Sequence, residues 1–142
     1  MVLDRRLLFV LQRAARSAVA RTNSRLAEQL EISVAQLGTL SFIFEHPDCA
    51  PSQIADLFDL NKSGVTTMLR RLERAGMIKR TANPQDGRGV LLRITRKGNE
   101  VRQASRPVFS SSMSDITAGF TKGEMEIVLR FLNTVIDRCG TE

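Results

Sequence analysis

Long apolar runs, cysteines and histidines are scarce in this sequence, and each shortage narrows the class of protein. No segment reaches the roughly 18 consecutive apolar residues of a membrane-spanning helix, so we expect no membrane partner. Two cysteines, Cys49 and Cys139, are too few for a disulfide scaffold and favour a cytoplasmic chain. His46, the only histidine, lacks a cysteine or carboxylate at metal-ligand spacing. We therefore predict no metal and no other cofactor, and we interpret His46 as a helix cap.

The motifs of an enzyme active site are also missing. The sequence has no phosphate-binding loop, no nucleophile motif and no carboxylate pair in a plausible cleft, which predicts that the protein is not an enzyme. Cys49 follows Asp48, whose negative charge would raise the pKa of the thiol, so we interpret both cysteines as structural or incidental. The apolar start of the chain is interrupted by Arg13 and Arg16, which indicates a helix and not a signal peptide.

Positive charge, in contrast, is plentiful and is confined to one region. The 142 residues, 42% of them apolar, fit a single domain with one core. Residues 61–106 contain twelve basic and three acidic residues, whereas the rest of the chain has nine basic and twelve acidic residues. Such an uneven distribution favours a polyanion as the partner over an ordinary solvated surface.

The first part of the chain predicts three helices. Residues 3–30 contain no glycine or proline and indicate one long helix. Ser33–Gln36 is a capping box that opens a second helix, which should end before Pro47. Pro51 suits the first turn of a short third helix. Three apolar residues of that helix are expected to face the core: Ile54, Leu57 and Phe58.

A fourth helix and a hairpin should follow. Asn61 can cap a helix that runs to about Ala75, where Gly76 is the expected stop. Residues 78–81 and 89–94 read as two strands of a β-hairpin, in which alternate apolar residues share one face.

Two more helices complete the predicted fold. Thr95 can cap a fifth helix, which Pro107 and the serines at 110–112 should kink or weaken. Thr121–Glu124 is a second capping box that opens the last helix. An apolar stripe runs along this last helix: Met125, Val128, Leu129, Leu132, Val135 and Ile136. We therefore predict a mainly α fold with six helices and a small two-stranded β-wing.

The two helices within residues 51–75 have helix-turn-helix spacing, with a tight turn at 59–61. At 100° per residue, the second helix has an apolar face formed by Val65, Met68, Leu69 and Leu72. Its opposite face carries the residues expected to contact DNA: Ser63, Thr66, Thr67, Arg70 and Arg74. The small hydroxyl residues allow close approach to base edges, and an arginine can reach a guanine or a phosphate. An ordinary amphipathic surface helix is the alternative, although such a helix usually contains more acidic residues.

Phosphate contacts are predicted for Ser52, Gln53 and Lys62.

The hairpin tip, within "ANPQDGRGVLLRIT" at 82–95, carries Arg88 two residues after Asp86. A narrow minor groove concentrates negative potential and attracts an inserted arginine, so we expect Arg88 to enter one. Asp86 would repel phosphates, so we expect it to support the wing by accepting hydrogen bonds from turn amides or from Arg88 or Arg80. A plain turn with a solvated arginine is the alternative.

Several features of the chain resemble the multiple-antibiotic-resistance regulator (MarR) family. They are Leu57, the segments "LGTLSFIFEHP" at 37–47 and "VTTMLRRLERAGMIKR" at 65–80, Asp86 with Arg88, and the run at 95–98. The resemblance covers nearly the whole chain. It implies a homodimeric winged helix-turn-helix regulator, usually a repressor, that binds an inverted repeat of double-stranded DNA. In one domain, 1–142, it implies a helical dimerisation region at 1–31 and 96–142 and a DNA-binding lobe at 33–95.

The resemblance also suggests a small effector, phenolic or carboxylated, bound between the dimer helices and the winged lobe. Arg13 and Arg16 could pair with such an anion, although arginines of this kind more often snorkel or bridge to acids across an interface. A peroxide-sensing branch of the family uses a reactive cysteine in the first helix, and this chain has none there.

Two function hypotheses follow. One is a sequence-specific DNA-binding repressor. The other is a winged-helix interaction module that docks acidic protein or RNA without reading sequence. The hydroxyl-rich face of the fourth helix and the wing arginine favour the first hypothesis.

Overall fold

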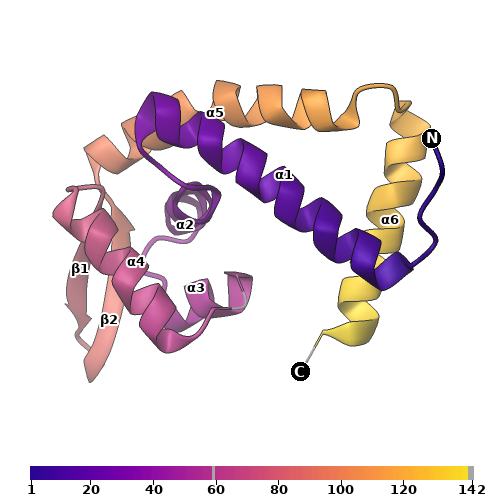
Figure 1. Cartoon of the computed structure of the whole chain (residues 1–142). Coiled ribbons are helices and arrows are strands. Elements are labelled where there is room, and N and C mark those ends of the chain that lie inside the picture. Colours follow the sequence, from indigo (N-terminus) through magenta and orange to yellow (C-terminus); the bar gives the residue numbers. More distant parts are fainter. Residues whose placement is uncertain (59, 141–142) are drawn as a thin grey trace. The chain divides into compact units, whose positions relative to one another are not determined.

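The computed structural model describes residues 1–58 and 60–140 and has the predicted elements in the predicted order (Figure 1). They are α1 (Leu7–Leu30), α2 (Val34–Glu45), α3 (Pro51–Phe58), α4 (Lys62–Arg74), β1 (Ile78–Asn83), β2 (Asp86–Ile94), α5 (Arg96–Thr117) and α6 (Lys122–Cys139). The chain forms two compact units, one up to residue 109 and one from residue 110. The mainly α fold with a two-stranded wing is confirmed.

The helix ends follow local side-chain chemistry. The capping box at Ser33 forms as predicted, because its hydroxyl accepts from the Gln36 amide and the Gln36 side chain accepts from the Ser33 amide. The box at Thr121–Glu124 forms in the same way, and Gly76 ends the α4 region with a φ of 75°. The first helix begins at Leu7, four residues later than predicted. Asp4 accepts hydrogen bonds from the backbone and side chain of Arg6, a local pattern that competes with helix formation.

The core of the first unit lies where α2, α3, α4 and the hairpin meet. Ile54 of α3 is fully buried and Phe58 packs against the core, as predicted. Leu57, however, is 49% exposed, so its predicted inward orientation is wrong. At 100° per residue the buried face of α3 centres between Ile54 and Phe58, and Leu57 lies well off that centre. The Phe58 ring also fills the space beside Gly38, where an added Cβ would lie 2.5 Å from the ring.

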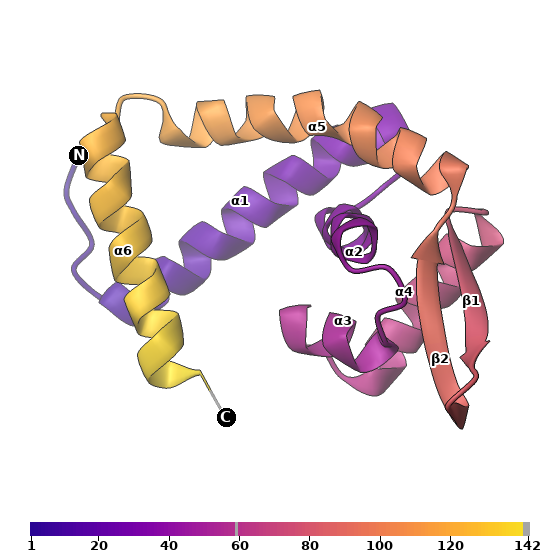
Figure 2. The same ribbon diagram turned by 180° about the vertical axis from the view of Figure 1, so that it is seen from behind.

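The strands are longer than predicted and pair antiparallel, with Ile78 opposite Ile94 and a register shift next to Asn83. Both views place the hairpin beside α4 (Figure 1, Figure 2). Leu92 is fully buried, and Val90 and Ile94 pack against the core, which confirms their shared face. The hairpin is therefore anchored at its base by apolar burial.

The segment around Cys49, which connects α2 to α3, pairs with the wing. The Leu92 amide donates to the Cys49 carbonyl at 2.9 Å, and the Asp48 amide donates to the Leu92 carbonyl at 3.0 Å. Cys49 is buried, and burial is the main reason that the pKa of its thiol is raised, with the Asp48 charge adding to it. His46 ends α2 as predicted, with its Nδ1 3.1 Å from the Phe42 carbonyl.

Helix α5 runs from Arg96 to Thr117 without a break, although it contains Pro107. In the second unit, α6 leaves much of its apolar stripe uncovered: Leu129 is 53% exposed and Ile136 is 65% exposed. Within the described residues, no helix has both the length and the apolar character needed to cross a membrane.

Candidate nucleic-acid interface

Helix α4 has the two faces that the sequence predicts. Its apolar side is buried against the core through Val65, Met68, Leu69 and Leu72. The opposite side is exposed and carries Ser63, Thr66, Thr67, Arg70 and Arg74. Because the buried face fixes the rotation of the helix about its axis, the five polar side chains are held outward together. The only acid in this helix is Glu73.

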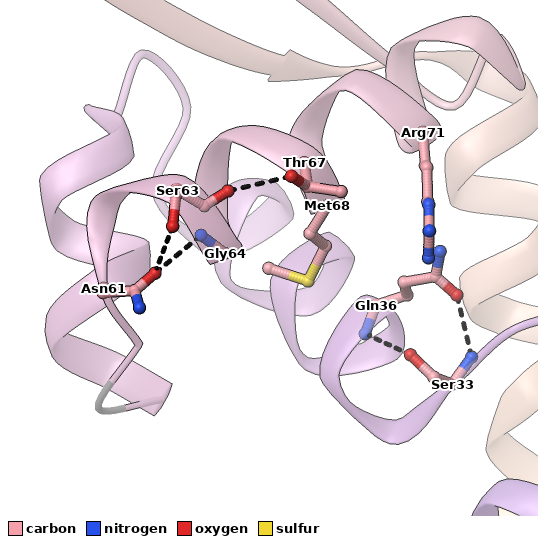
Figure 3. A pocket seen from close by; sticks show the side chains of 8 residues that line it. All are labelled: Ser33, Gln36, Asn61, Ser63, Gly64, Thr67, Met68 and Arg71. Carbon is pink, nitrogen blue, oxygen red and sulfur yellow. Dashed lines mark hydrogen bonds between the residues drawn. The ribbon is translucent and has the colours of Figure 1, made fainter.

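The first turn of α4 is held by Asn61. Its Oδ1 accepts hydrogen bonds from the Gly64 amide and from the Ser63 hydroxyl, both at 2.8 Å (Figure 3). Before it, the Leu60 amide donates to the Ala55 carbonyl of α3 at 3.1 Å. Asp59, which we placed in the turn, lies outside the described residues. The Asn61 cap predicted from the sequence is confirmed.

An open groove of about 540 Å³ lies between the start of α2 and the exposed side of α4 (Figure 3). It is lined by Ser33, Gln36, Asn61, Ser63, Gly64, Thr67, Met68 and Arg71. Arg71 and Gln36 were not among the predicted site residues, and Figure 3 shows the Arg71 side chain directed toward Gln36. The sequence carries no signal for this neighbourhood, because 35 positions separate the two residues and only packing brings them together.

A second hollow, of about 190 Å³, lies between α3 and α4. It brings together three predicted contact residues, Ser52, Lys62 and Thr66. Gln53, the remaining predicted phosphate contact, is exposed, and its Oε1 accepts a hydrogen bond from the Ala50 amide at 2.8 Å. Its side-chain NH₂ group is the part left to act as a donor.

The wing tip is shaped by hydrogen bonds to backbone amides. Asp86 Oδ1 accepts from the Arg88 amide at 3.1 Å, and Asn83 Oδ1 accepts from the Gln85 amide at 3.0 Å. Of the alternatives considered for Asp86, the structure therefore shows the bond to a turn amide. Among the described residues, no ion pair joins Asp86 to Arg80 or Arg88. The Arg88 side chain is exposed at the end of the hairpin.

An ion pair that sequence reasoning missed ties the wing to the connection between α2 and α3. Arg93 Nε lies 2.7 Å from Asp48 Oδ1, and Arg93 Nη2 lies 2.6 Å from Asp48 Oδ2. The hydrogen bond from Arg93 lowers the pKa of the Asp48 carboxyl, and the same bond raises the pKa of the guanidinium. Asp48 has a φ of 66°, in the left-handed region.

The run at 95–98 fixes the end of α4 against the start of α5. The Thr95 hydroxyl donates to the Gly76 carbonyl, and Lys97 Nζ donates to the Ala75 carbonyl, both at 2.6 Å. Gly98 sits so close to Met77 that an added Cβ would lie 2.0 Å from its carbonyl oxygen. Thr95 also accepts from the Gly98 amide, which confirms it as the predicted cap.

Comparison with known proteins identifies the family of this chain. The sequence model of the MarR family matches residues 32–90. The uncharacterised helix-turn-helix transcriptional regulator YdcH of Bacillus subtilis (strain 168) is 30% identical over 103 residues, covering 70% of each chain. The chain belongs to the MarR family. The regulator BilQ of Clostridioides difficile (strain CD3) is 31% identical over 98 residues, which cover 69% of this chain and 66% of BilQ. The chain thus spans just under two thirds of the length of BilQ.

The similarity to a solved structure extends beyond the segment that the family model matches. The crystal structure of Streptococcus pneumoniae FabT in complex with DNA is 25% identical, with a TM-score of 0.75, over 95% of this chain and 96% of FabT. The shared fold therefore includes helices on both sides of residues 32–90.

The two arginines that could pair with an anionic effector, or instead snorkel or bridge to acids, lie on α1 of this MarR-family chain. Arg13 and Arg16 are both exposed. Their role in binding an effector stays a prediction.

Proposed function

We propose that this MarR-family protein is a transcriptional repressor that binds an inverted-repeat DNA operator as a homodimer and responds to a small effector. The observation that carries the proposal is the pairing, in one compact unit, of an acid-poor outer face on α4 with an exposed wing-tip arginine. Helix and wing of this kind are suited to the major groove and the adjacent minor groove, respectively. The DNA complex of FabT supports the proposal.

Each predicted side chain has a role in this proposal. The five outward residues of α4 read base edges in the major groove, and Arg88 enters the minor groove with Asp86 supporting the turn. Ser52, Gln53 and Lys62 hold phosphates, which set the register of the protein on the duplex. No step of this function is enzymatic, and it requires no metal or cofactor. The cytoplasm is the corresponding location.

The dimer rests on the uncovered apolar side chains of α6. An obligate interface buries more than about 2,000 Å² in total, and such interfaces resemble a domain core. We assign 1–31 and 96–142 to dimerisation and 33–95 to DNA binding. A two-fold dimer then requires half-sites about 10 bp apart, or a multiple of that. Light scattering should give the mass of a dimer at micromolar concentration, and a stable monomer would contradict this assignment.

The effector in this proposal is phenolic or carboxylated, with Arg13 and Arg16 as candidate contacts for its negative charge. This proposal gives neither cysteine a role in sensing. Cys49 is buried and its thiol pKa is raised, Cys139 lies at the end of α6, and α1 contains no cysteine. Changing both cysteines to serine should therefore leave DNA affinity and any response to organic peroxide unaltered.

The proposal is tested by selection of duplexes from a random pool, followed by binding measurements to selected and random DNA at two salt concentrations. A repressor of this kind should enrich one inverted repeat and prefer it at both salt concentrations. An interaction module for acidic protein or RNA should bind both duplexes alike and lose both as salt rises. That second outcome would replace the proposed function.

A further inference from the structure

Each hydroxyl group on the outer face of α4 donates its one hydrogen to another group of the same chain. Ser63 Oγ donates to Asn61 Oδ1 at 2.8 Å, Thr66 Oγ1 to the Lys62 carbonyl at 2.8 Å, and Thr67 Oγ1 to the Ser63 carbonyl at 2.9 Å. Figure 3 shows the bonds of Ser63 and Thr67. A hydroxyl group has one hydrogen and two lone pairs, so these groups face solvent as hydrogen-bond acceptors.

Turning these hydroxyls outward as donors would cost the bonds they make. For Ser63 this would give up the bond to Asn61 Oδ1, which also accepts from the Gly64 amide. For the two threonines, the alternative rotamers would give up a bond to a carbonyl one turn earlier on the same helix. In the folded helix these three hydroxyl groups are therefore available to a partner as hydrogen-bond acceptors.

Farther along the same face, the side chain offers hydrogen-bond donors instead of acceptors. Arg70 lies three residues after Thr67 and is exposed. A guanidinium has five hydrogen-bond donors and no acceptor. The outer face of α4 thus has acceptors and methyl groups near its start and donors about one turn later.

We propose that Thr66 and Thr67 make the operator select A·T base pairs beside the base that Arg70 reads, an inference that rests on the proposed function. In the major groove an A·T pair offers the adenine N6 amino group as a donor and the thymine C5 methyl as an apolar contact. A threonine whose hydroxyl is an acceptor matches both groups. Guanine offers only the acceptors O6 and N7 there, which would face the lone pairs of the hydroxyl.

Cytosine is the closest competitor, since its N4 amino group is also a donor, but a C·G pair has no methyl group for the threonine methyl.

The spacing of Thr67 and Arg70 along α4 predicts how far apart their base contacts lie. A helix rises about 1.5 Å per residue, so Thr67 and Arg70 are separated by about 4.5 Å along the helix axis. Base pairs are about 3.4 Å apart, which places the A·T pairs within one or two steps of the guanine contacted by Arg70.

The experiment uses the full chain and an operator selected from random duplexes. Each thymine of that operator is replaced in turn by deoxyuridine, which removes only the methyl group, and each adenine by purine, which removes only the amino group. For the wild-type chain, replacement at a contacted position should weaken binding about fourfold for the methyl group and about fivefold for the amino group.

Matched variants assign these losses to the threonines. Thr66→Ser and Thr67→Ser keep the oxygen and remove the methyl group. One of them should therefore abolish the effect of deoxyuridine at the thymine that this threonine contacts. Thr66→Val and Thr67→Val keep a methyl group and remove the oxygen, so one should abolish the effect of purine. Ser24→Ala, which removes the same kind of hydroxyl-to-carbonyl bond on α1, should change neither. Circular dichroism should show equal helicity in all five variants.

Two results would overturn the inference. One is a selected operator with guanine opposite both threonines. The other is analogue effects that are the same in the wild-type chain and in every threonine variant. Both leave the proposed function intact, because an operator has still been selected. A selection that enriches no sequence at all would instead contradict the proposed function, and this inference with it.

Discussion

Helix α4 and the hairpin β1–β2 both present arginine side chains to solvent, but their backbones are held in different ways. Four apolar side chains of α4, from Val65 to Leu72, are buried. The hairpin is buried only at its base, around Ile78 and Leu92, and its tip is exposed. Substitutions on the outer face of α4 should therefore change contacts without moving the helix, whereas the wing tip also depends on residues that never touch DNA.

The largest effect is expected from a substitution in the core against which both α4 and the hairpin pack. Leu72→Ala should lower the free energy of unfolding by about 2–5 kcal/mol, because it leaves a cavity where α4 meets the core. Denaturant titration measures this. Arg74→Ala, on the outer face of the same helix, should change the stability by less than about 0.5 kcal/mol. Equal losses in the two variants would mean that the faces of α4 do not differ as described.

The next change tests base reading by the helix. Arg70→Ala should weaken binding to the selected operator more than to random DNA, reducing the discrimination by about 1–3 kcal/mol, because one base contact is lost. The measurement is a titration of both duplexes under one buffer condition. An equal loss on both duplexes would show that Arg70 contacts phosphates only.

The same substitution in the wing should have a different signature. Arg88→Ala should weaken binding to both duplexes by similar factors, and it should make the salt dependence shallower by up to about one unit of slope. Asp86→Ala should have a milder effect of the same kind, because it removes the bond to the Arg88 amide but keeps the positive charge. A salt titration of each variant checks this. Unchanged binding by Arg88→Ala would place the wing away from DNA.

The smallest effect is expected from the ion pair at the base of the wing. Pairing with Arg93 lowers the pKa of Asp48 from its ordinary value of 3.8. The pair therefore stabilises the fold above that pH, and this contribution is lost as the pH falls through the lowered pKa. Asp48→Asn should be less stable than wild type near neutral pH, and the difference should disappear in acid.

Unfolding curves between neutral pH and about pH 2 measure this difference. Glu100→Gln is the matched control, because it breaks the exposed Arg96–Glu100 pair within a single helix. It should leave the wing, and therefore DNA binding, unchanged. A pH-independent difference for Asp48→Asn would mean that its charge does not contribute to stability.

Much of the fold was predictable because its signals are local. The caps at Ser33, Asn61, Thr95 and Thr121 each use a side chain that bonds an amide three residues away. The same holds for the outward face of α4, since the spacing of its apolar residues already defines the opposite side. The predicted start of α1 was wrong for an equally local reason, because the hydrogen bonds from Arg6 to Asp4 compete with the first helical turn.

The sequence by itself determined the order of the elements, the helix caps and the polar face of α4, because each depends on residues within one or two turns of one another. Only the tertiary structure decided that Leu57 is exposed, that Cys49 pairs with Leu92, and that Asp48 meets Arg93 across 45 positions. Such contacts depend on how α2, α3 and the hairpin pack together. Residue spacing along the chain does not encode those distances.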